Sequence, residues 1–347
     1  MGSAGVTMIK AGADEKIYPV VKIAALVDAL AAEGVAPADA LSGVHLAKRA
    51  LSSPTTRVSL NQVIRCCSNA ARLARDPSFA FRAGLGFHVT TYGVYGFATL
   101  SSTNFRQTMT FWQKYHELAT PLVELSFTEE SKRAFWTITP LSLPQVDLQL
   151  YRFLVELQYG IFLSLHRDIM GPSFAVKELH VTYGPPNPSH DYQKIFEAPA
   201  FFGRPQNRWI YDATWLDAVP QFGNEVTYSA ILEMCNELLE QMQLRVGLPG
   251  KVREVLLSNL MRPTSLVDVA RQLDMSPRTL RRKLSEHGTS FRKLVDELRM
   301  HVAIKYLRDT KLTIEDIAAV MGFSDAANFR QAFRRWTGRA PLEYRAS

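Results

Sequence analysis

The sequence predicts an α+β N-terminal domain followed by an all-α C-terminal domain, in which two helix-turn-helix units are joined by a long helix. Three observations support this division. A short helical motif occurs twice between residues 265 and 336. The basic charge of the chain is concentrated in the same region. The preceding 245 residues are nearly neutral and rich in apolar side chains, and they mix helical with strand-like patterns.

The N-terminal domain is expected to span residues 1–245 and to be helical up to about residue 78. Residues 20–32 carry a dense apolar stripe that ends at Gly34. A second helix is expected at 59–74, where Ser59 and Gln62 have the spacing of a capping pair. This part of the chain is therefore predicted to be a small helical cluster.

After residue 78 the pattern becomes mixed. Residues 127–138 and 175–183 are rich in β-branched and aromatic side chains and are followed by turn-forming prolines, so both are predicted to be strands. Helices are predicted at 103–118 and 143–166. The domain is therefore expected to be α+β.

One further helix is predicted at 226–244, before a short linker at 246–250. Its apolar face is formed by Tyr228, Ile231, Leu232, Cys235, Leu238, Leu239 and Met242. This face could pack onto its own domain or onto a second copy of the chain. The sequence leaves both alternatives open.

The C-terminal domain, residues 251–347, contains the repeated motif. Two residues recur 48 positions later and two recur 49 positions later: Ala270 as Ala318, Ser276 as Ser324, Leu280 as Phe329, and Leu284 as Phe333. The change of spacing indicates that one residue is inserted inside the second copy. The two small residues lie where the first helix of each unit must approach the second closely.

Helix-start signals mark both copies. Ser265 is followed three residues later by Asp268, and Thr313 by Asp316, as expected for capping boxes at the start of each first helix. Each second helix is expected to open on the recurring serine, which is followed by a proline in one copy and an aspartate in the other.

Charge points to a polyanion partner for this domain. Residues 251–347 hold 19 Lys and Arg against 11 Asp and Glu, so the remainder of this +7 chain has a net charge of −1. Segregated basic charge is the electrostatic signature of a nucleic-acid-binding module attached to a neutral domain. A solvated basic surface is the alternative, but the duplicated motif favours DNA.

The helix predicted at 291–307 lies between the two units. About 17 residues of helix are about 25 Å long. This length could hold two recognition helices in successive major-groove segments, which repeat about every 34 Å. One chain would then read two adjacent segments of a duplex.

Residues 262–345 resemble the DNA-binding domain of the AraC/XylS family of bacterial transcription regulators. The most specific stretch is Ile317-Ala318-x-x-Met321-Gly322-Phe323-Ser324-Asp325, which continues to Pro341 and Tyr344. In that family the second helix of each unit enters the major groove. The resemblance implies base-facing roles for Arg278, Arg281, Arg282, Asn328, Arg330 and Gln331.

The chemistry of these side chains suits such roles. Arginine can bond to both O6 and N7 of guanine, and Asn or Gln can pair in a similar way with adenine. Four other basic residues, Lys283, Arg334, Arg335 and Arg339, are expected to contact phosphates, which position a protein without specifying sequence.

The N-terminal domain resembles the arabinose-binding-type sensor domain found in a subgroup of these regulators. The resemblance is carried by Asp76-Pro77, Phe79, Arg82 and Gly84, and by Tyr92-Gly93-x-x-Gly96-Phe97-Ala98. The chain departs from the usual pattern at Asn104-Phe105, where a Thr-Leu pair is commoner. Members resemble one another without sharing a ligand.

A hydrophobic or amphipathic organic effector is expected for this sensor, because small-molecule pockets are mainly apolar with a few placed polar groups. Candidate contacts are Trp112, His116 and Tyr159, on helix faces predicted to point inward. Ordinary core packing is the alternative for all three.

An enzyme is not expected. The three cysteines form no CxxC pair, and the eight histidines form no metal-ligand pattern. No cofactor or metal is predicted. With no signal peptide and no long apolar run, a cytoplasmic, nucleoid-associated protein without membrane contact is expected.

The sequence thus predicts a ligand-responsive transcription regulator with promoter DNA and a small organic effector as partners. RNA polymerase is a further candidate partner, and the family resemblance implies a homodimer. A constitutive architectural DNA binder and a metabolite enzyme fused to a DNA anchor are the alternatives. The effector, the operator and the direction of regulation, activation or repression, are left open.

Overall fold

The computed structural model describes residues 12–185, 192–258 and 264–345. The chain forms two compact units that divide between Glu240 and Gln241. They are called the N-terminal unit and the C-terminal unit, and each is described by itself. No helix among the described residues is both long enough and apolar enough to cross a membrane.

The N-terminal unit begins with a helical cluster, as predicted. It consists of α1 (Val21–Ala32), α2 (Pro37–Ala40), the 3-10 turn η1 (Lys48–Ser52) and α3 (Leu60–Leu73), with a two-residue ladder between β1 (Tyr18–Pro19) and β2 (Arg57–Val58). Ser59 caps α3: its Oγ accepts from the Gln62 amide at 3.2 Å, and Gln62 Oε1 accepts from the Ser59 amide at 3.0 Å. The predicted capping pair is confirmed.

Helical structure continues well beyond residue 78, where a mixed pattern was predicted to begin. The chain forms α4 (Phe79–Leu85), η2 (Val89–Tyr92), α5 (Val94–Ser101), α6 (Phe105–Tyr115) and η3 (His116–Ala119) before the first long strand. Asn104 is the N-cap of α6, since its Oδ1 accepts from the Gln107 amide at 2.8 Å. The departure from the family pattern at this position therefore keeps a functional helix cap.

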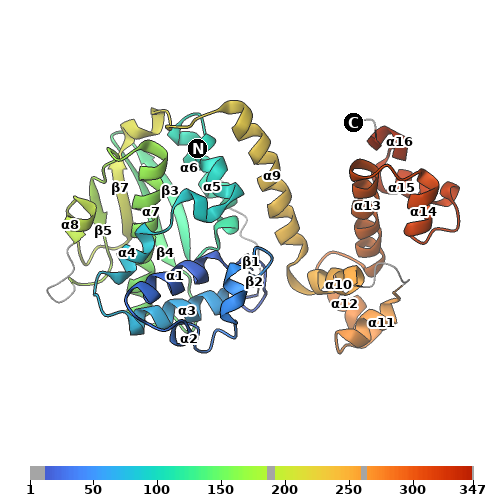
Figure 1. Cartoon of the computed structure of the whole chain (residues 1–347), viewed down its shortest axis with the longest axis horizontal. Helices are drawn as coiled ribbons and strands as arrows, with labels where there is room; N and C mark the ends of the chain where they lie inside the picture. The colour runs from blue at the N-terminus through green and yellow to red at the C-terminus, as the bar shows by residue number, and fades with distance from the viewer. Residues whose placement is uncertain (1–11, 186–191, 259–263, 346–347) are drawn as a thin grey trace. The chain divides into compact units, whose positions relative to one another are not determined.

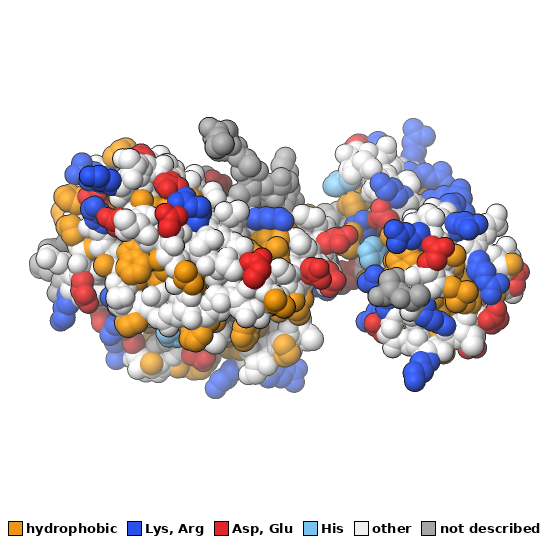
Figure 2. Space-filling model, turned by 90° about the horizontal axis from the view of Figure 1, so that it is seen from above, with side chains coloured by type: hydrophobic (Ala, Val, Ile, Leu, Met, Phe, Trp, Pro, Cys, Tyr) orange, Lys and Arg blue, Asp and Glu red, His pale blue; other side chains and the backbone are white. Residues whose placement is uncertain are grey.

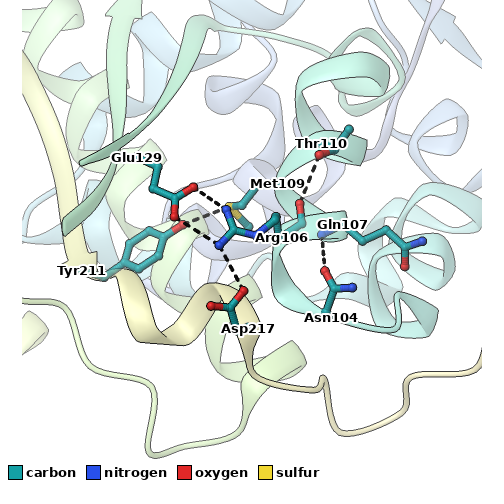
Figure 3. A network of polar contacts seen from close by, with 8 residues as sticks. All are labelled: Asn104, Arg106, Gln107, Met109, Thr110, Glu129, Tyr211 and Asp217. Carbon is teal, nitrogen blue, oxygen red and sulfur yellow. Dashed lines mark hydrogen bonds and ion pairs between the residues drawn. The ribbon is translucent and has the colours of Figure 1, made fainter. Parts of the chain in front are cut away.

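Arg106, in the first turn of α6, fastens this helix to two other segments of the unit. Its guanidinium pairs with both carboxylate oxygens of Glu129 and, through Nη2, with Asp217 Oδ1 at 3.0 Å (Figure 3). Nearby, Tyr211 Oη donates to Met109 Sδ at 3.0 Å. These contacts join α6 to the sheet and to η4 (Ala213–Asp217).

A five-stranded sheet follows, in the order β3-β4-β7-β5-β6. Its strands are β3 (Val123–Glu130), β4 (Arg133–Pro140), β5 (Glu178–His180), β6 (Ala200–Phe201) and β7 (Asn207–Asp212). Among the described strands of this sheet, β5 and β6 pair in parallel and the other neighbours pair antiparallel. In the register of the central strands, Trp136 lies opposite Phe127 on β3 and opposite Trp209 on β7.

Two strand predictions need correction. The stretch 127–138 is not one strand but parts of the β3–β4 hairpin, whose turn at Ser131-Lys132 has no Gly, Pro or Asn to mark it. The strand predicted at 175–183 is shortened to the three residues of β5, and β6 and β7 were not predicted.

Helix α7 (Leu148–Met170) lies along the sheet and is the centre of the N-terminal unit (Figure 1). Most of its 23 residues are buried, which is why its sequence is apolar on nearly every side. It also packs closely on α4 through two glycines: a Cβ on Gly160 would lie 2.3 Å from the Phe81 carbonyl oxygen, and one on Gly84 would lie 2.4 Å from the Leu157 carbonyl oxygen. Glycine at these positions lets the two backbones touch.

The short helix α8 (Tyr192–Phe196) and the long helix α9 (Glu225–Leu244) complete this part of the chain. The predicted linker at 246–250 is wrong, because α10 (Gly247–Ser258) begins there. Gly247 takes a left-handed φ of 70°, and Pro249 lies in the first turn of the helix, where an amide proton is not needed. The turn-forming residues thus mark the start of a helix.

The remaining helices of the C-terminal unit are α11 (Leu266–Gln272), α12 (Pro277–Glu286), α13 (Phe291–Asp309), α14 (Ile314–Val320), α15 (Ala326–Thr337) and α16 (Pro341–Arg345). They surround two separate apolar cores. One contains Val252, Leu280 and Leu284, and the other contains Phe329 and Phe333. Helix α13 contributes to both: Leu294 to the first, and Ala303 and Leu307 to the second.

The structure reproduces the repeat in the first helix and the turn of each copy. Both predicted capping boxes form. Two residues after the end of each first helix lies a residue with left-handed φ, Asp274 at 53° and Gly322 at 72°. The next amide then turns back to the small residue of the helix: Met275 N donates to the Ala270 oxygen at 2.8 Å, and Phe323 N donates to the Ala318 oxygen at 2.9 Å.

One helix start differs from the prediction. Helix α12 is capped by Ser276, as expected, but α15 is capped by Asp325 and not by Ser324. Asp325 Oδ1 accepts from the Asn328 amide at 2.7 Å. The inserted residue of the second copy therefore lies in the turn, between Phe323 and the start of α15.

Candidate nucleic-acid interface and effector pocket

Helix α12 separates an apolar face from an arginine face. Leu280 and Leu284 are fully buried in the first core. Arg278, Arg281 and Arg282 are all exposed and follow one another at the three- and four-residue spacing of a single helix face. The structure therefore brings the three predicted base-facing residues of this copy together on an open surface.

The three arginines differ in how they are held. Arg282 Nη1 pairs with Glu286 Oε1 at 2.5 Å, with both side chains more than half exposed. Such an exposed pair is worth about 0–1 kcal/mol, so it could give way to a base or a phosphate. Within the described ranges, Arg278 and Arg281 have no side-chain partner. Lys283, predicted to contact phosphate, is half-buried at the side of the helix.

Helix α15 has the same division. Phe329, Ala332 and Phe333 face inward. Arg330 and Gln331 are exposed, and Arg330 Nη2 pairs with Glu315 Oε1 of α14 at 3.0 Å. This pair links the two helices of the second copy across the turn.

Asn328 is exposed but engaged locally. Its Nδ2 donates to Ser324 Oγ at 2.7 Å and to Asp325 Oδ2 at 2.9 Å. Adenine recognition by this side chain would need at least one of these bonds to be exchanged. Asn328 therefore has a role in holding the start of α15 that the sequence did not suggest.

The other predicted phosphate contacts lie around the end of α15. Arg334, Arg335 and Arg339 are all exposed. Arg335 Nη2 lies 3.5 Å from Asp296 Oδ1, which connects α15 to α13. Basic side chains stand over the C-terminal unit, the right-hand part of Figure 2, among acidic ones.

Two of the three residues predicted to contact an effector belong to the core. Trp112 stacks on Phe162 with ring centroids 5.8 Å apart, and its Nε1 donates to Thr99 Oγ1 at 3.1 Å. Tyr159 is fully buried, and its hydroxyl donates to the His180 carbonyl oxygen at 2.5 Å. Their apolar surface and polar atoms are already matched within the unit, so the structure favours the core-packing alternative.

His116 lies at the end of α6 and is half-buried. Its Nε2 is 2.9 Å from the Val123 carbonyl oxygen. Burial lowers the pKa of His116 to about 4, which keeps the ring neutral near pH 7. None of these three residues lines the cavity described next.

A cavity of about 840 Å³ opens in the N-terminal unit, between the end of α3, the start of α4, the first half of α7 and the segment after β5. Its walls include Phe79, Tyr151 and Phe153, together with Arg75, Asp76, Arg152 and Glu156. Sites for small molecules have this size and this mixture of apolar walls with few polar groups. The sequence did not indicate this site, because its residues come from three distant segments.

The three cysteines, Cys66, Cys67 and Cys235, are free and buried. Burial raises the pKa of the Cys66 thiol to about 12, so it is held as the unreactive thiol. Among the described residues, no group of three or more His, Cys, Asp or Glu side chains could hold a metal ion.

Both units match models of known protein families. Residues 34–219 match the family model of the arabinose-binding domain of AraC transcription regulators, and residues 269–347 match a helix-turn-helix domain. The first match alone covers more than half of the chain.

Relatives and a solved structure match along nearly the whole chain. The ornithine utilization regulator of Pseudomonas aeruginosa is 29% identical over 331 residues, which cover 95% of this chain and 96% of that protein. An uncharacterized HTH-type transcriptional regulator of Mycobacterium tuberculosis is 29% identical over 344 residues, with 94% and 96% covered. The crystal structure of the transcriptional regulator CdpR from Pseudomonas aeruginosa shares the fold, with a TM-score of 0.50 and 23% identity over 93% of this chain and 97% of that one.

These relatives are transcription regulators and not enzymes. The mixed α+β unit is the ligand-sensor domain of such proteins, and the helical unit is their DNA-binding domain. The chain belongs to the AraC/XylS family of transcription regulators, with an arabinose-binding-type sensor domain ahead of its helix-turn-helix domain.

Proposed function

We propose that this regulator binds promoter DNA through two helix-turn-helix units, α11–α12 and α14–α15, joined by α13. The observation that carries the proposal is the repeat: two helix pairs whose first helices both start with a capping box, with the same turn hydrogen bond and an exposed polar face on the second helix. Helices presented in this way suit the major groove.

The proposed base-reading residues are Arg278, Arg281 and Arg282 on α12, and Arg330 and Gln331 on α15. Asn328 joins them when its cap bonds exchange for a base. The proposed phosphate contacts are Lys283, Arg334, Arg335 and Arg339. Exposure of nearly all of these side chains supports the assignment.

The experiment for this proposal is selection of binding sites from random DNA, followed by cleavage protection on the selected duplex. Each bound chain should protect two patches about one helical turn apart. A single protected patch per chain would show that one unit does the reading alone.

We also propose that a small organic effector, bound in the sensor domain, controls DNA binding. The family assignment and the open cavity support this, and one relative is named for the utilization of ornithine, a small organic molecule. An effector must favour one conformation over another, so its influence on DNA affinity must equal the influence of DNA on its own affinity. A ligand that binds without changing DNA affinity or transcription would favour a constitutive architectural binder.

Homodimerisation through α9 is a further proposal. Tyr228 and Cys235 are buried, so part of the predicted apolar face already packs within the chain. Val226, Met234 and Leu238 of the same helix are exposed. Leu238→Glu should shift a dimer toward monomer in analytical ultracentrifugation, whereas Glu237→Gln should not.

RNA polymerase is proposed as the protein partner that the regulator contacts at the promoter.

A further inference from the structure

The cavity of the sensor domain has an aromatic wall. The rings of Phe79 on α4 and Phe153 on α7 lie 6.4 Å apart with an angle of 24° between their planes. Both side chains are largely buried, and Ala71, Ala80 and Pro185 add further apolar surface. A ligand in this cavity would therefore bury an apolar body against fixed rings.

The two acidic residues in the wall are already neutralised. Glu156 is buried, and its Oε1 accepts from Arg152 Nε at 2.7 Å and from Tyr192 Oη at 2.8 Å. Asp76 Oδ2 lies 2.8 Å from Nη2 of Arg82, which stands outside the cavity. Both carboxylates therefore have a guanidinium partner, although Arg82 is shared between Asp76 and Glu33.

Arg75 is the other basic residue in the cavity wall, besides Arg152. It lines the cavity, is exposed, and has no side-chain partner among the residues that the structure describes. Arg152 is paired with Glu156, and Arg82 is paired with both Asp76 and Glu33, so each of these charged side chains already has a partner. The planar Arg75 guanidinium is therefore the one in the cavity wall that can bind a ligand carboxylate through two hydrogen bonds without displacing a partner among the described residues.

We infer that the effector is an organic carboxylate, with its apolar body against Phe79 and Phe153 and its carboxylate paired with Arg75. This inference deepens the proposed effector control and rests on it. Arg152 is a positioning residue here: Glu156 fixes one side of its guanidinium, which lies 5.8 Å from the centre of the Tyr183 ring.

The test uses the full-length protein and four matched probes. Naphthylacetate carries the carboxylate, naphthylacetamide is its neutral counterpart, naphthylethylamine is cationic and naphthylalanine is zwitterionic. Isothermal titration should show that the carboxylate binds about tenfold or more tightly than the amide, because a charged hydrogen-bonded pair is lost in the amide. The amine should bind most weakly.

Variants at α3 separate a specific contact from general electrostatics. Arg75→Gln should remove most of the preference for the carboxylate over the amide. Arg72→Gln is the control, since Arg72 is exposed near the same helix end but does not line the cavity. Arg75→Glu should reverse the preference and favour the amine. Thermal unfolding of each variant checks that the fold is retained.

The inference would be overturned by equal binding of carboxylate and amide, by unchanged selectivity in Arg75→Gln, or by no binding of naphthylacetate at millimolar concentration. Much tighter binding of naphthylalanine than of naphthylacetate would also overturn it, in favour of a zwitterionic effector. DNA titrations keep this test separate from the proposed function. Carboxylate binding that leaves DNA affinity unchanged would uphold the cavity assignment and contradict effector control.

Discussion

At the scale of single residues, we propose that the exposed arginines comprise residues that read bases and residues that contact phosphates. Arg282 lies on the open face of α12, whereas Arg335 lies near the end of α15 beside Asp296. A bidentate contact to guanine depends on the base, but a phosphate contact does not.

Arg282→Ala should therefore lose about 1–3 kcal/mol of discrimination at one guanine position. Arg335→Ala is the matched comparison and should weaken binding to all sequences alike, with the salt dependence reduced by about one unit of slope. Binding-site selection and titrations at several salt concentrations measure both effects. An unchanged preferred sequence in Arg282→Ala would show that this arginine does not read a base.

His166 gives a second residue-scale prediction. It is fully buried among aromatic rings, and burial lowers its pKa from 6.5 to about 3. The unfolded chain takes up a proton on this residue below pH 6.5 while the folded chain does not, so stability falls as the pH drops from about 6.5 toward 3. The contribution is about 1.4 kcal/mol per pH unit.

His166→Phe should make the unfolding free energy less dependent on pH between 6 and 4, roughly by that slope. Urea unfolding at a series of pH values measures the change, and a comparison at pH 8 isolates the effect of packing alone. If the variant kept the full slope of the parent, another group would have to carry the proton uptake. His116, with its pKa lowered to about 4, is expected to supply part of what remains.

At the scale of elements, the contact between α4 and α7 depends on two glycines. Gly160→Ala would gain about 1 kcal/mol of helix propensity. Its new Cβ would lie 2.3 Å from the Phe81 carbonyl oxygen, and overpacking of this kind costs about 1–3 kcal/mol or more when backbone must move. The free-energy cost of the clash is therefore larger than the gain in helix propensity.

We therefore expect Gly160→Ala to lower the unfolding free energy by about 1–2 kcal/mol or more. Gly184→Ala is the control, because no atom lies within 4 Å of its added Cβ. Its effect should stay within about 0.5 kcal/mol. Equal stability of the two variants in chemical unfolding would show that the helices can separate at little cost.

The elements also show which features could be read from the sequence. The first helix of each repeat could be predicted because its capping residues lie close to one another in the sequence. These are Ser265 with Asp268 and Thr313 with Asp316. The β3–β4 turn carries no Gly, Pro or Asn, and β7 is only six residues long, so neither has a strong local signal. The boundary near residue 246 was misplaced because Gly247 and Pro249 suit a helix start as well as a linker.

The same contrast between local and distant sequence signals applies to the candidate sites. The arginine face of α12 repeats at helical spacing and could be predicted. The sensor cavity could not, since Arg75, Phe153 and Thr182 meet only after α3, α7 and the segment after β5 have packed. Trp112 and Tyr159 looked equally suitable in the sequence, because the same aromatic character serves a core and a pocket.

At the scale of the whole molecule, the phase of α13 should decide whether both helix-turn-helix units can bind one face of a duplex. Inserting two alanines between Val302 and Ala303 would rotate the second unit by about 200° at 3.6 residues per turn. We expect a large loss of affinity for the selected two-patch site and little change for a site that carries one patch. Gel-shift titrations on both duplexes compare these outcomes. Undiminished affinity for the two-patch site would contradict simultaneous reading.

Helix α13 supplies Leu294 to one core and Ala303 with Leu307 to the other, so the two halves of the C-terminal unit share this helix. Melting either half frays the helix on which the other depends, so the free-energy cost of opening one core includes part of the other. The unit should behave as one cooperative folding domain despite its two small cores. Amide protons of α11 and α14 should then exchange with solvent at similar opening free energies, and a mutation in one core should accelerate exchange in both.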